Sequence, residues 1–298
     1  MQQELIIAIL AGLSGMLGWG FADFFAKKTV DKVGSIVSLV WAHVFGTLAL
    51  CLVALYQVFI LRGQLALPND PKTWGLLLLF GALQAAVYLL AYQAFSKGKL
   101  AIINPIFASY SGLAALISIV VLGEKISPYL LITLGIIFGG ILLLNMDINA
   151  LRLKRIKLVG TPGLKEAVLA ALLAAIWTVS WDKFVGGKDW LSYALLMYGF
   201  MTLTAFVVSK LQRINLAIAH NGLWKFFILI GTCEVIAYLG ISLGFSTTSF
   251  TSTVALLSGA FSLPTIILAR IFLKEKVTNV QTVGSLVIIA GIILLSII

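Results

Sequence analysis

The sequence predicts an all-α integral membrane protein with ten transmembrane helices, arranged as two inverted repeats of five helices. Three observations predict this fold. Of the 298 residues, 61% are hydrophobic and only 11% are charged, whereas soluble domains carry about 25% charged residues. The apolar runs are about 20 residues long and do not alternate with polar residues, which favours helices over a β-barrel. The two halves also share polar and glycine positions at a nearly constant offset.

The apolar runs define the expected helices in chain order. They cover roughly residues 5–26, 36–61, 73–96, 101–122, 128–146, 165–185, 190–209, 223–245, 250–273 and 277–297. Most connections are very short, so neighbouring helices must form antiparallel hairpins. The first run has no basic stretch and no small-residue cleavage site, so we expect a retained helix rather than a signal peptide.

A basic segment at 147–164 divides the chain into a first repeat, 1–146, and a second repeat, 165–298. This connecting loop is expected either to lie on the membrane surface or to be a solvated linker. Across the division, Tyr88 corresponds to Tyr238 at an offset of 150 residues. Five helices are an odd number of crossings, so the two copies must cross the membrane in opposite senses. This arrangement is typical of secondary transporters, whose binding site lies between the halves near the bilayer midplane.

Glu234 is the most informative single residue. It lies eleven residues into the 23-residue apolar run 223–245, near the middle of the expected eighth helix. A carboxylate at this depth costs roughly 2.5–3.5 kcal/mol unless it is paired, protonated or facing a wet cavity. We therefore expect Glu234 to bind cargo and to be the coupling residue that exchanges protons, since removal from water favours the neutral acid. The alternative is a packing role, with the carboxyl satisfied by a Thr, Tyr or His of a neighbouring helix.

Other polar and aromatic side chains at similar depth are candidates for substrate binding. Gln84 corresponds to Glu234 in the repeat, so the two are expected to face each other across the pseudo-twofold axis. Tyr88 and Tyr238 lie one helical turn further on. The remaining candidates are Trp19, Trp177, Asn104, Tyr110 and Ser258. For the tryptophans the alternative is an interfacial belt, which suits Trp181 best.

Four acidic residues near helix ends are gate or boundary candidates. Asp23 and Asp182 are expected to form either gate ion pairs with neighbouring lysines or contacts with the substrate. Glu124 and Glu275 each lie three residues before a Ser or Thr that can cap the next helix, so a boundary role at a positive helix end is favoured.

Several remaining features favour structural roles. His43 is expected to be a hydrogen-bonded packing residue, and the motifs Gly135-x-x-x-Gly139 and Gly240-x-x-x-Gly244 indicate close helix packing. The two cysteines lie in apolar runs and predict no disulfide. No metal or cofactor is expected, because the carboxylates in the spans are few and scattered and no zinc or phosphate-binding motif is present.

The chain resembles the EamA-type branch of the drug/metabolite transporter superfamily. The resemblance rests on ten spans, the five-plus-five duplication, a Trp-Gly pair at 19–20, and Gly-Glu-Lys and Lys-Glu-Lys at 123–125 and 274–276. It implies a central cavity lined by helices 1, 3, 4, 6, 8 and 9, and transport by alternating access.

The chain departs from this family in one respect. The family often carries a proline in windows that correspond here to residues 109–111 and 260–262, whereas this chain has Pro105 and Pro264. We therefore expect the helix bends to fall at different heights. Relatives carry amino acids, sugars, nucleotide sugars and amines, so the resemblance leaves the cargo open.

These observations predict a secondary active transporter, not an enzyme, that moves a small amino acid or amine by alternating access coupled to protons. Aromatic side chains near one buried carboxylate suit a small cation or zwitterion. The alternatives are a sugar or nucleotide-sugar transporter of the same fold, an intramembrane enzyme that uses Glu234 as an acid, and a scaffold without transport. The oligomeric state is left open.

The expected partners are the lipid bilayer and a small-molecule substrate. Nucleic acid is not expected, because the basic residues behind the net charge of +10 lie in short loops between spans. The expected location is the inner or plasma membrane, crossed many times.

The distribution of basic residues predicts the orientation. The loops after the odd-numbered helices carry 16 of the 21 Lys and Arg residues. The positive-inside bias then makes these loops cytoplasmic and places both termini outside the cytoplasm, whereas relatives of the family commonly place both termini inside. Alkaline phosphatase fused after Ile298 is expected to be active. An inactive phosphatase together with a fluorescent green fluorescent protein at the same position would contradict this orientation.

Overall fold

The computed structural model describes residues 2–97, 100–146, 162–218, 221–274, 276–295 and 297, and these residues contain helices and no strands. In chain order the helices are α1 Gln2–Val33, α2 Ser35–Phe59, α3 Pro71–Lys97, α4 Leu100–Ala108, α5 Tyr110–Leu116, the π-helix η1 Ile117–Val121, α6 Pro128–Asn145, α8 Leu164–Val185, α9 Trp190–Leu211, the 3-10 turn η2 Asn221–Leu223, α10 Trp224–Thr247, α11 Thr251–Gly259, α12 Ser262–Phe272 and α13 Asn279–Leu295. Most of the connecting segment 147–164, and also Glu275, lie outside the described residues.

Nine segments of the described chain are long and apolar enough to cross a membrane. The last expected span is present as α13, a shorter apolar helix of 17 residues. At 1.5 Å per residue this helix is about 26 Å long, slightly less than the hydrocarbon layer. The ten expected spans therefore appear as nine of full length and one that is shorter.

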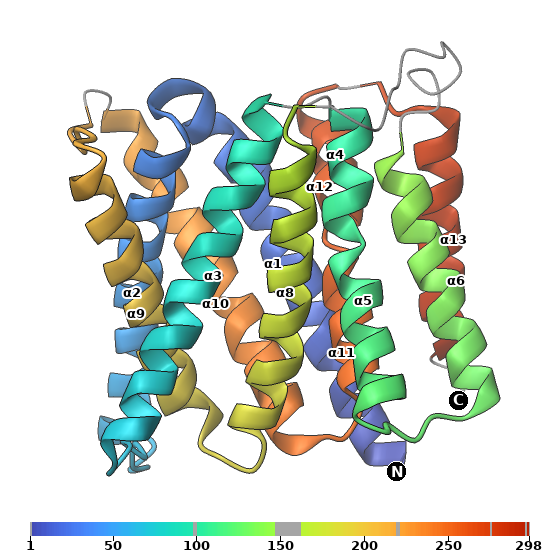
Figure 1. The fold of residues 1–298 in the computed structure, drawn as a ribbon, viewed down its shortest axis with the longest axis horizontal. Coiled ribbons are helices and arrows are strands. Elements are labelled where there is room, and N and C mark those ends of the chain that lie inside the picture. Colours follow the sequence, from blue (N-terminus) through green and yellow to red (C-terminus); the bar gives the residue numbers. More distant parts are fainter. Residues whose placement is uncertain are drawn as a thin grey trace.

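Both termini lie at the same end of the bundle, at the bottom of Figure 1. We call this end the terminal face, and we call the opposite end, which carries the loops after α1, α3, α9 and α12, the basic face. Helix α1 runs from the terminal face to the basic face, and its counterpart α8 runs in the opposite direction (Figure 1). The two halves therefore cross the layer in opposite senses.

The helix packing is mixed between the halves. Helix α1 packs on α10 and α11, and its counterpart α8 packs on α3, α4 and α5. Helices α6 and α13, which end the two halves, pack on each other at one side of the bundle (Figure 1). Superposition of the halves by a rotation about an axis in the membrane plane stays a prediction.

The fourth and ninth expected spans are each broken near their middle. The first break lies at Ser109, between α4 and α5, and the second at residues 260–261, between α11 and α12. These are the windows in which the family carries proline, so the expected displacement of the bends is wrong. At the first break Ser109 supplies the local support, because its N–H and its hydroxyl both donate to Ile106 O. Interrupted helices at this depth are typical of transporter sites.

A single residue, Gly34, joins α1 to α2. Its φ of 80° lies in the left-handed region, which glycine adopts without strain. The two long helices therefore meet at a one-residue corner on the basic face.

Glycines set the close contact between α1 and α10. A Cβ added to Gly18 would lie 2.5 Å from the Cys233 carbonyl oxygen, and one added to Gly240 would collide with Ser14. A Cβ at Gly244 would lie 2.5 Å from Ala11 Cβ. The expected packing role of the Gly240 and Gly244 motif is confirmed.

The corresponding expectation for Gly135 and Gly139 is wrong. In the described structure no atom lies within 4 Å of a Cβ added to either residue. The neighbouring Gly140 makes the close contact instead, where an added Cβ would lie 2.8 Å from Ile288 Cγ1 of α13. One residue corresponds to about 100° around a helix, which is enough to turn the motif away from the partner helix.

We expect Gly18→Ala to lower the melting temperature of the purified protein in detergent. The new methyl group meets the α10 backbone, which cannot rotate away, and overpacking of this kind costs about 1–3 kcal/mol. Gly135→Ala is the matched control, because its methyl group meets open space and alanine favours the helix. Equal melting temperatures for the two variants would contradict the proposed contact.

Candidate functional site

Glu234 lies near the middle of α10 and is only 5% exposed. The hydroxyl of Tyr198, from α9, donates a 2.7 Å hydrogen bond to Glu234 Oε2. His43 Nε2, from α2, lies 3.7 Å from the same oxygen. Two neighbouring helices therefore supply partners to the carboxyl, as the packing alternative anticipated. The same contacts are what a buried proton-binding carboxyl needs.

His43 is fully buried and oriented by its own helix. Its Nδ1 lies 2.7 Å from the carbonyl oxygen of Leu39, one turn earlier. The imidazole stacks on Tyr198, with ring centres 5.2 Å apart, and meets Tyr88 edge-on at 5.5 Å. The expected hydrogen bond of His43 is present, and the sequence did not indicate its proximity to Glu234.

A second group of contacts surrounds Tyr238, one turn beyond Glu234 on α10. Gln84 Nε2 donates a 2.9 Å hydrogen bond to the Tyr238 hydroxyl, which also shares a hydrogen bond with Tyr88. The hydrogen-bond partner of Gln84 is therefore Tyr238 rather than its repeat counterpart Glu234. Trp19 meets the Tyr238 ring edge-on at 5.6 Å.

Two buried polar atoms beside Tyr238 lack a hydrogen-bond partner within the part of the chain that the structure describes. They are the indole N–H of Trp19, a donor, and Oε1 of Gln84, an acceptor. Unsatisfied buried polar atoms are rare in folded proteins, so both atoms call for a partner that the described residues do not supply. We call Trp19, Gln84, Tyr88 and Tyr238 the aromatic cluster.

Trp177 and Trp181 form a wall beside the aromatic cluster. Their rings stack with centres 5.7 Å apart, and both side chains are at most 2% exposed. Trp177 Nε1 donates to Phe80 O and Trp181 Nε1 donates to Ser242 Oγ. An interfacial belt is therefore wrong for Trp181, which lies in the protein core.

The remaining substrate candidates are placed less centrally. Ser258 is buried in α11 against Gly15 of α1, and its hydroxyl donates to the Ala255 carbonyl of its own helix. Asn104 is half-buried in α4. Tyr110, at the start of α5, lies within electrostatic range of the Tyr238 hydroxyl.

Asp23 is the second carboxyl near the cluster. It lies one turn beyond Trp19 on α1 and is exposed. It interacts electrostatically with Glu234 and Tyr92. Asp23 is thus an exposed carboxyl within electrostatic range of the buried Glu234.

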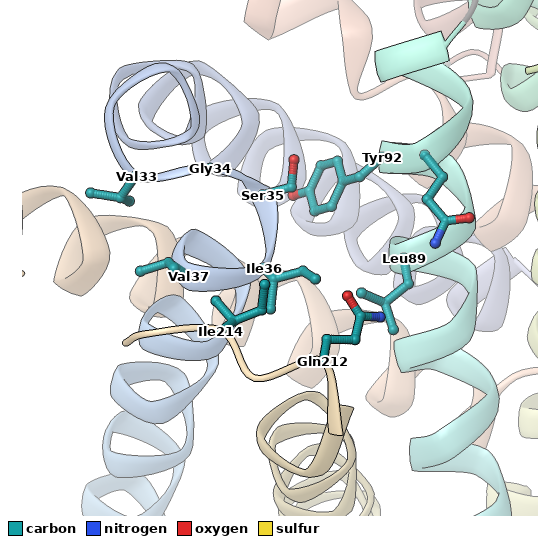
Figure 2. Close-up of a pocket in the computed structure, with 10 residues that line it drawn as sticks. Val33, Gly34, Ser35, Ile36, Val37, Leu89, Tyr92, Gln212 and Ile214 are labelled. Atoms are coloured by element: carbon teal, nitrogen blue, oxygen red, sulfur yellow. The ribbon is translucent and has the colours of Figure 1, made fainter. Parts of the chain in front are cut away.

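A cavity of about 320 Å³ opens at the basic face (Figure 2). Its lining includes Gly34 and Ser35 at the α1–α2 corner, Leu89 and Tyr92 of α3, and Gln212 after α9. In Figure 2 the Tyr92 ring faces the space between α3 and the start of α2. Tyr92 lies 6.3 Å from Tyr88, ring centre to ring centre, so the inner wall of the cavity reaches the aromatic cluster.

The terminal face is held together by acidic residues at the N-terminus of α11. Glu124 accepts hydrogen bonds from Ser252 N at 2.9 Å, from Ser252 Oγ at 2.5 Å and from Ser118 Oγ at 2.5 Å. Asp182 accepts a hydrogen bond from the Thr251 side chain. A negative charge at a helix N-terminus is favourable, so these contacts join the fourth, sixth and ninth spans.

The same region contains a cavity of about 470 Å³, lined by both acids. The expected ion pair of Asp182 with a neighbouring lysine is present, since Lys183 Nζ lies 3.8 Å from its carboxylate. Glu275 lies outside the described residues. Among all the described residues, no group of three His, Cys, Asp or Glu side chains could hold a metal ion.

Sequence reasoning missed three residues near the site: Tyr198, Tyr92 and the functional position of His43. Tyr92 had a usable signal, because it lies one turn beyond Tyr88 on the same helix face. Tyr198 had none, because the repeat is not visible in the seventh span.

Comparison with known proteins matches one protein family over both halves of the chain. The model of the EamA-like transporter family matches residues 6–146 and 161–297. A solved crystal structure is similar in fold, with a TM-score of 0.77 and 15% sequence identity over 97% of this chain and 96% of that chain. At this identity the likeness shows the fold alone. No curated protein matches the sequence.

We expect Glu124→Gln to destabilise the protein by about 1.5–3 kcal/mol, because it weakens hydrogen bonds to a charged group at a helix end. The measurement is the melting temperature in detergent. Glu166→Gln is the matched control, since Glu166 forms a partly exposed ion pair with Lys97 that contributes at most about 1 kcal/mol. If the two variants have the same melting temperature, the contact of Glu124 with α11 does not stabilise the terminal face.

Proposed function

Since this chain belongs to the EamA-like transporter family, we propose that it carries a small amino acid or amine across the membrane in exchange for protons. The resemblance to the drug/metabolite transporter superfamily is confirmed, as is the presence of two repeated halves. The chain is a multi-pass membrane protein. Members of this family are transporters and not enzymes, which argues against the intramembrane-enzyme alternative.

The observation that carries the proposal is the unpartnered donor and acceptor beside Tyr238. The Trp19 indole N–H suits a carboxylate oxygen, and Gln84 Oε1 suits an ammonium group. An α-amino acid presents both groups a few ångströms apart. A cargo that supplies both partners would remove two unsatisfied buried atoms, and this gain favours its binding.

Charge and aromatic character support a cationic group in the cargo. Two carboxyls, Asp23 and Glu234, lie within electrostatic range of one another. The rings of Trp19, Tyr88 and Tyr238 lie beside them and can attract an ammonium group by cation–π contact. A sugar could donate hydrogen bonds to the two carboxyls, but it carries no positive charge that would balance them.

Access to the site alternates, in this proposal, through two related gates. In the described state one cavity opens at the basic face, and at the terminal face Glu124 and Asp182 bind the start of α11 beside the second cavity. The repeat relates Glu124 to Glu275, and Asp23 roughly to Asp182. In the opposite state Asp23 and Glu275 would hold the basic face near the start of α4, and the terminal face would open.

Cargo and proton compete for Glu234. An arriving ammonium group favours the carboxylate and releases the proton, and a returning proton releases the cargo. This competition is sufficient for antiport.

We expect Glu234→Gln to fold, because a neutral amide is less costly to bury than a charge, and to lose pH-driven transport. A thermal-shift screen of amino acids, amines and sugars first identifies a cargo. Binding of a cationic cargo should weaken at least tenfold, or about 1.4 kcal/mol. The measurement is flux into proteoliposomes with and without an imposed pH gradient.

Gln84→Ala is the companion variant. It should change the affinity for the cargo and leave the proton dependence intact, because it removes the proposed acceptor but not the carboxyl. Wild-type, pH-driven flux from Glu234→Gln would show that Glu234 is a packing residue. A screen in which only sugars stabilise the protein would instead favour the sugar-transporter alternative.

A further inference from the structure

The hydrogen bond to Leu39 fixes which nitrogen of His43 carries a proton. A carbonyl oxygen can only accept, so Nδ1, 2.7 Å away, must be the donor in both charge states of the ring. The remaining nitrogen, Nε2, therefore changes between a lone pair and an N–H. This nitrogen is the atom that faces Glu234.

The facing atoms cannot both be acceptors without a cost. If His43 were neutral and Glu234 ionised, a lone pair would face a carboxylate oxygen at 3.7 Å in a buried environment. His43 Nε2 has no other hydrogen-bond partner among the described residues. A proton between the two atoms removes this repulsion, and a shift of less than about 1 Å would complete the hydrogen bond.

Charge accounting favours one proton on the pair. With no shared proton the pair carries a net charge of −1, and with two it carries +1. With one it is neutral overall, either as imidazolium and carboxylate or as imidazole and carboxylic acid. His43 is 0% exposed and Glu234 5% exposed, so an unbalanced charge at this site is costly.

We propose that the proton-binding site of this transporter is the His43–Glu234 pair, which shares one proton across the contact between α2 and α10. The inference rests on the proposed function for its role in transport, but not for its chemistry. When a cationic group arrives, the shared proton leaves. The cation then balances the carboxylate, and His43 is left neutral with its Nδ1–H still on Leu39 O.

The other titratable groups around the pair do not remove the need for this proton. Tyr198 already donates its only proton to Glu234 Oε2. Other described groups that interact electrostatically with Glu234 are Asp23 of α1, Tyr88 and Tyr92 of α3, and Cys233 and Tyr238 of α10. Asp23 is a second carboxyl within electrostatic range of Glu234, so it supplies no positive charge that could balance the Glu234 carboxylate.

Nitrogen-15 NMR of labelled histidine tests the pair directly and needs no cargo. The chain has two histidines, so His220→Gln leaves His43 as the single signal. In that background we expect Nδ1 to stay protonated between pH 5 and 9, and Nε2 to report a bound or hydrogen-bonded proton at pH 7. Loss of this proton should occur at least one pH unit higher than in Glu234→Gln, a tenfold change in proton affinity.

Glu166→Gln, which removes a carboxylate at the basic face, should leave the His43 titration unchanged. Tyr198→Phe keeps the pair and removes a donor to the carboxylate, so its midpoint should equal or exceed that of the parent. A free Nε2 at pH 7 in the parent protein, or equal midpoints in parent and Glu234→Gln, would overturn the proposal. The first of these outcomes needs no folded Glu234 variant.

The outcomes separate this inference from the transport proposal. A shared proton without pH-driven flux would keep the pair and reject proton coupling. Proton-coupled flux with a free Nε2 would keep the transporter and leave Glu234 alone as the proton carrier.

Discussion

The close contact between α1 and α10 positions the chemistry of this protein. The Cys233 carbonyl rests against Gly18, where no other side chain fits. This contact brings Trp19 against Tyr238 on the α1 side of α10. Glu234 directly follows Cys233 on α10, so its side chain is turned by about 100° from Cys233 and faces α2 and α9. Tyr238, one turn beyond Glu234, meets Trp19 of α1 and also Tyr198 of α9, so it connects the aromatic cluster to the buried carboxyl.

The energy of burying Glu234 explains why it has two partners. Its insertion cost is roughly 2.5–3.5 kcal/mol, and a hydrogen bond to a charged group contributes about 1.5–3 kcal/mol. The Tyr198 hydroxyl alone therefore offsets most of the cost but leaves little margin. The proximity of His43 supplies the rest in a form that depends on protonation. Because the cost of burying the carboxylate and the stabilisation from its partners are similar in size, an arriving cation can change the charge of Glu234.

The sequence was sufficient for the helices, the repeat and the residues of the aromatic cluster, because these depend on apolar length and on spacing along one helix. It also predicted that Ser127 caps α6, where its hydroxyl accepts from Leu130 N. It was not sufficient for contacts between distant helices. Tyr198 and Glu234 meet because of how α9 and α10 are rotated, and Glu124 reaches Ser252 across 128 residues. The rotation of α6 about its own axis likewise decides which glycine meets α13. Gly140 makes that contact, and the Gly135 motif faces away from it.

The one-residue corner at Gly34 has a mechanical consequence. Helix α1 carries Asp23 and α2 carries His43, and no loop separates the two helices that could absorb a relative displacement. A tilt of α1 that narrows the cavity at the basic face must pull on the first turns of α2, which also line that cavity. Because this corner is a single residue, we expect occlusion of the entrance to change the distance from His43 to Glu234 as well.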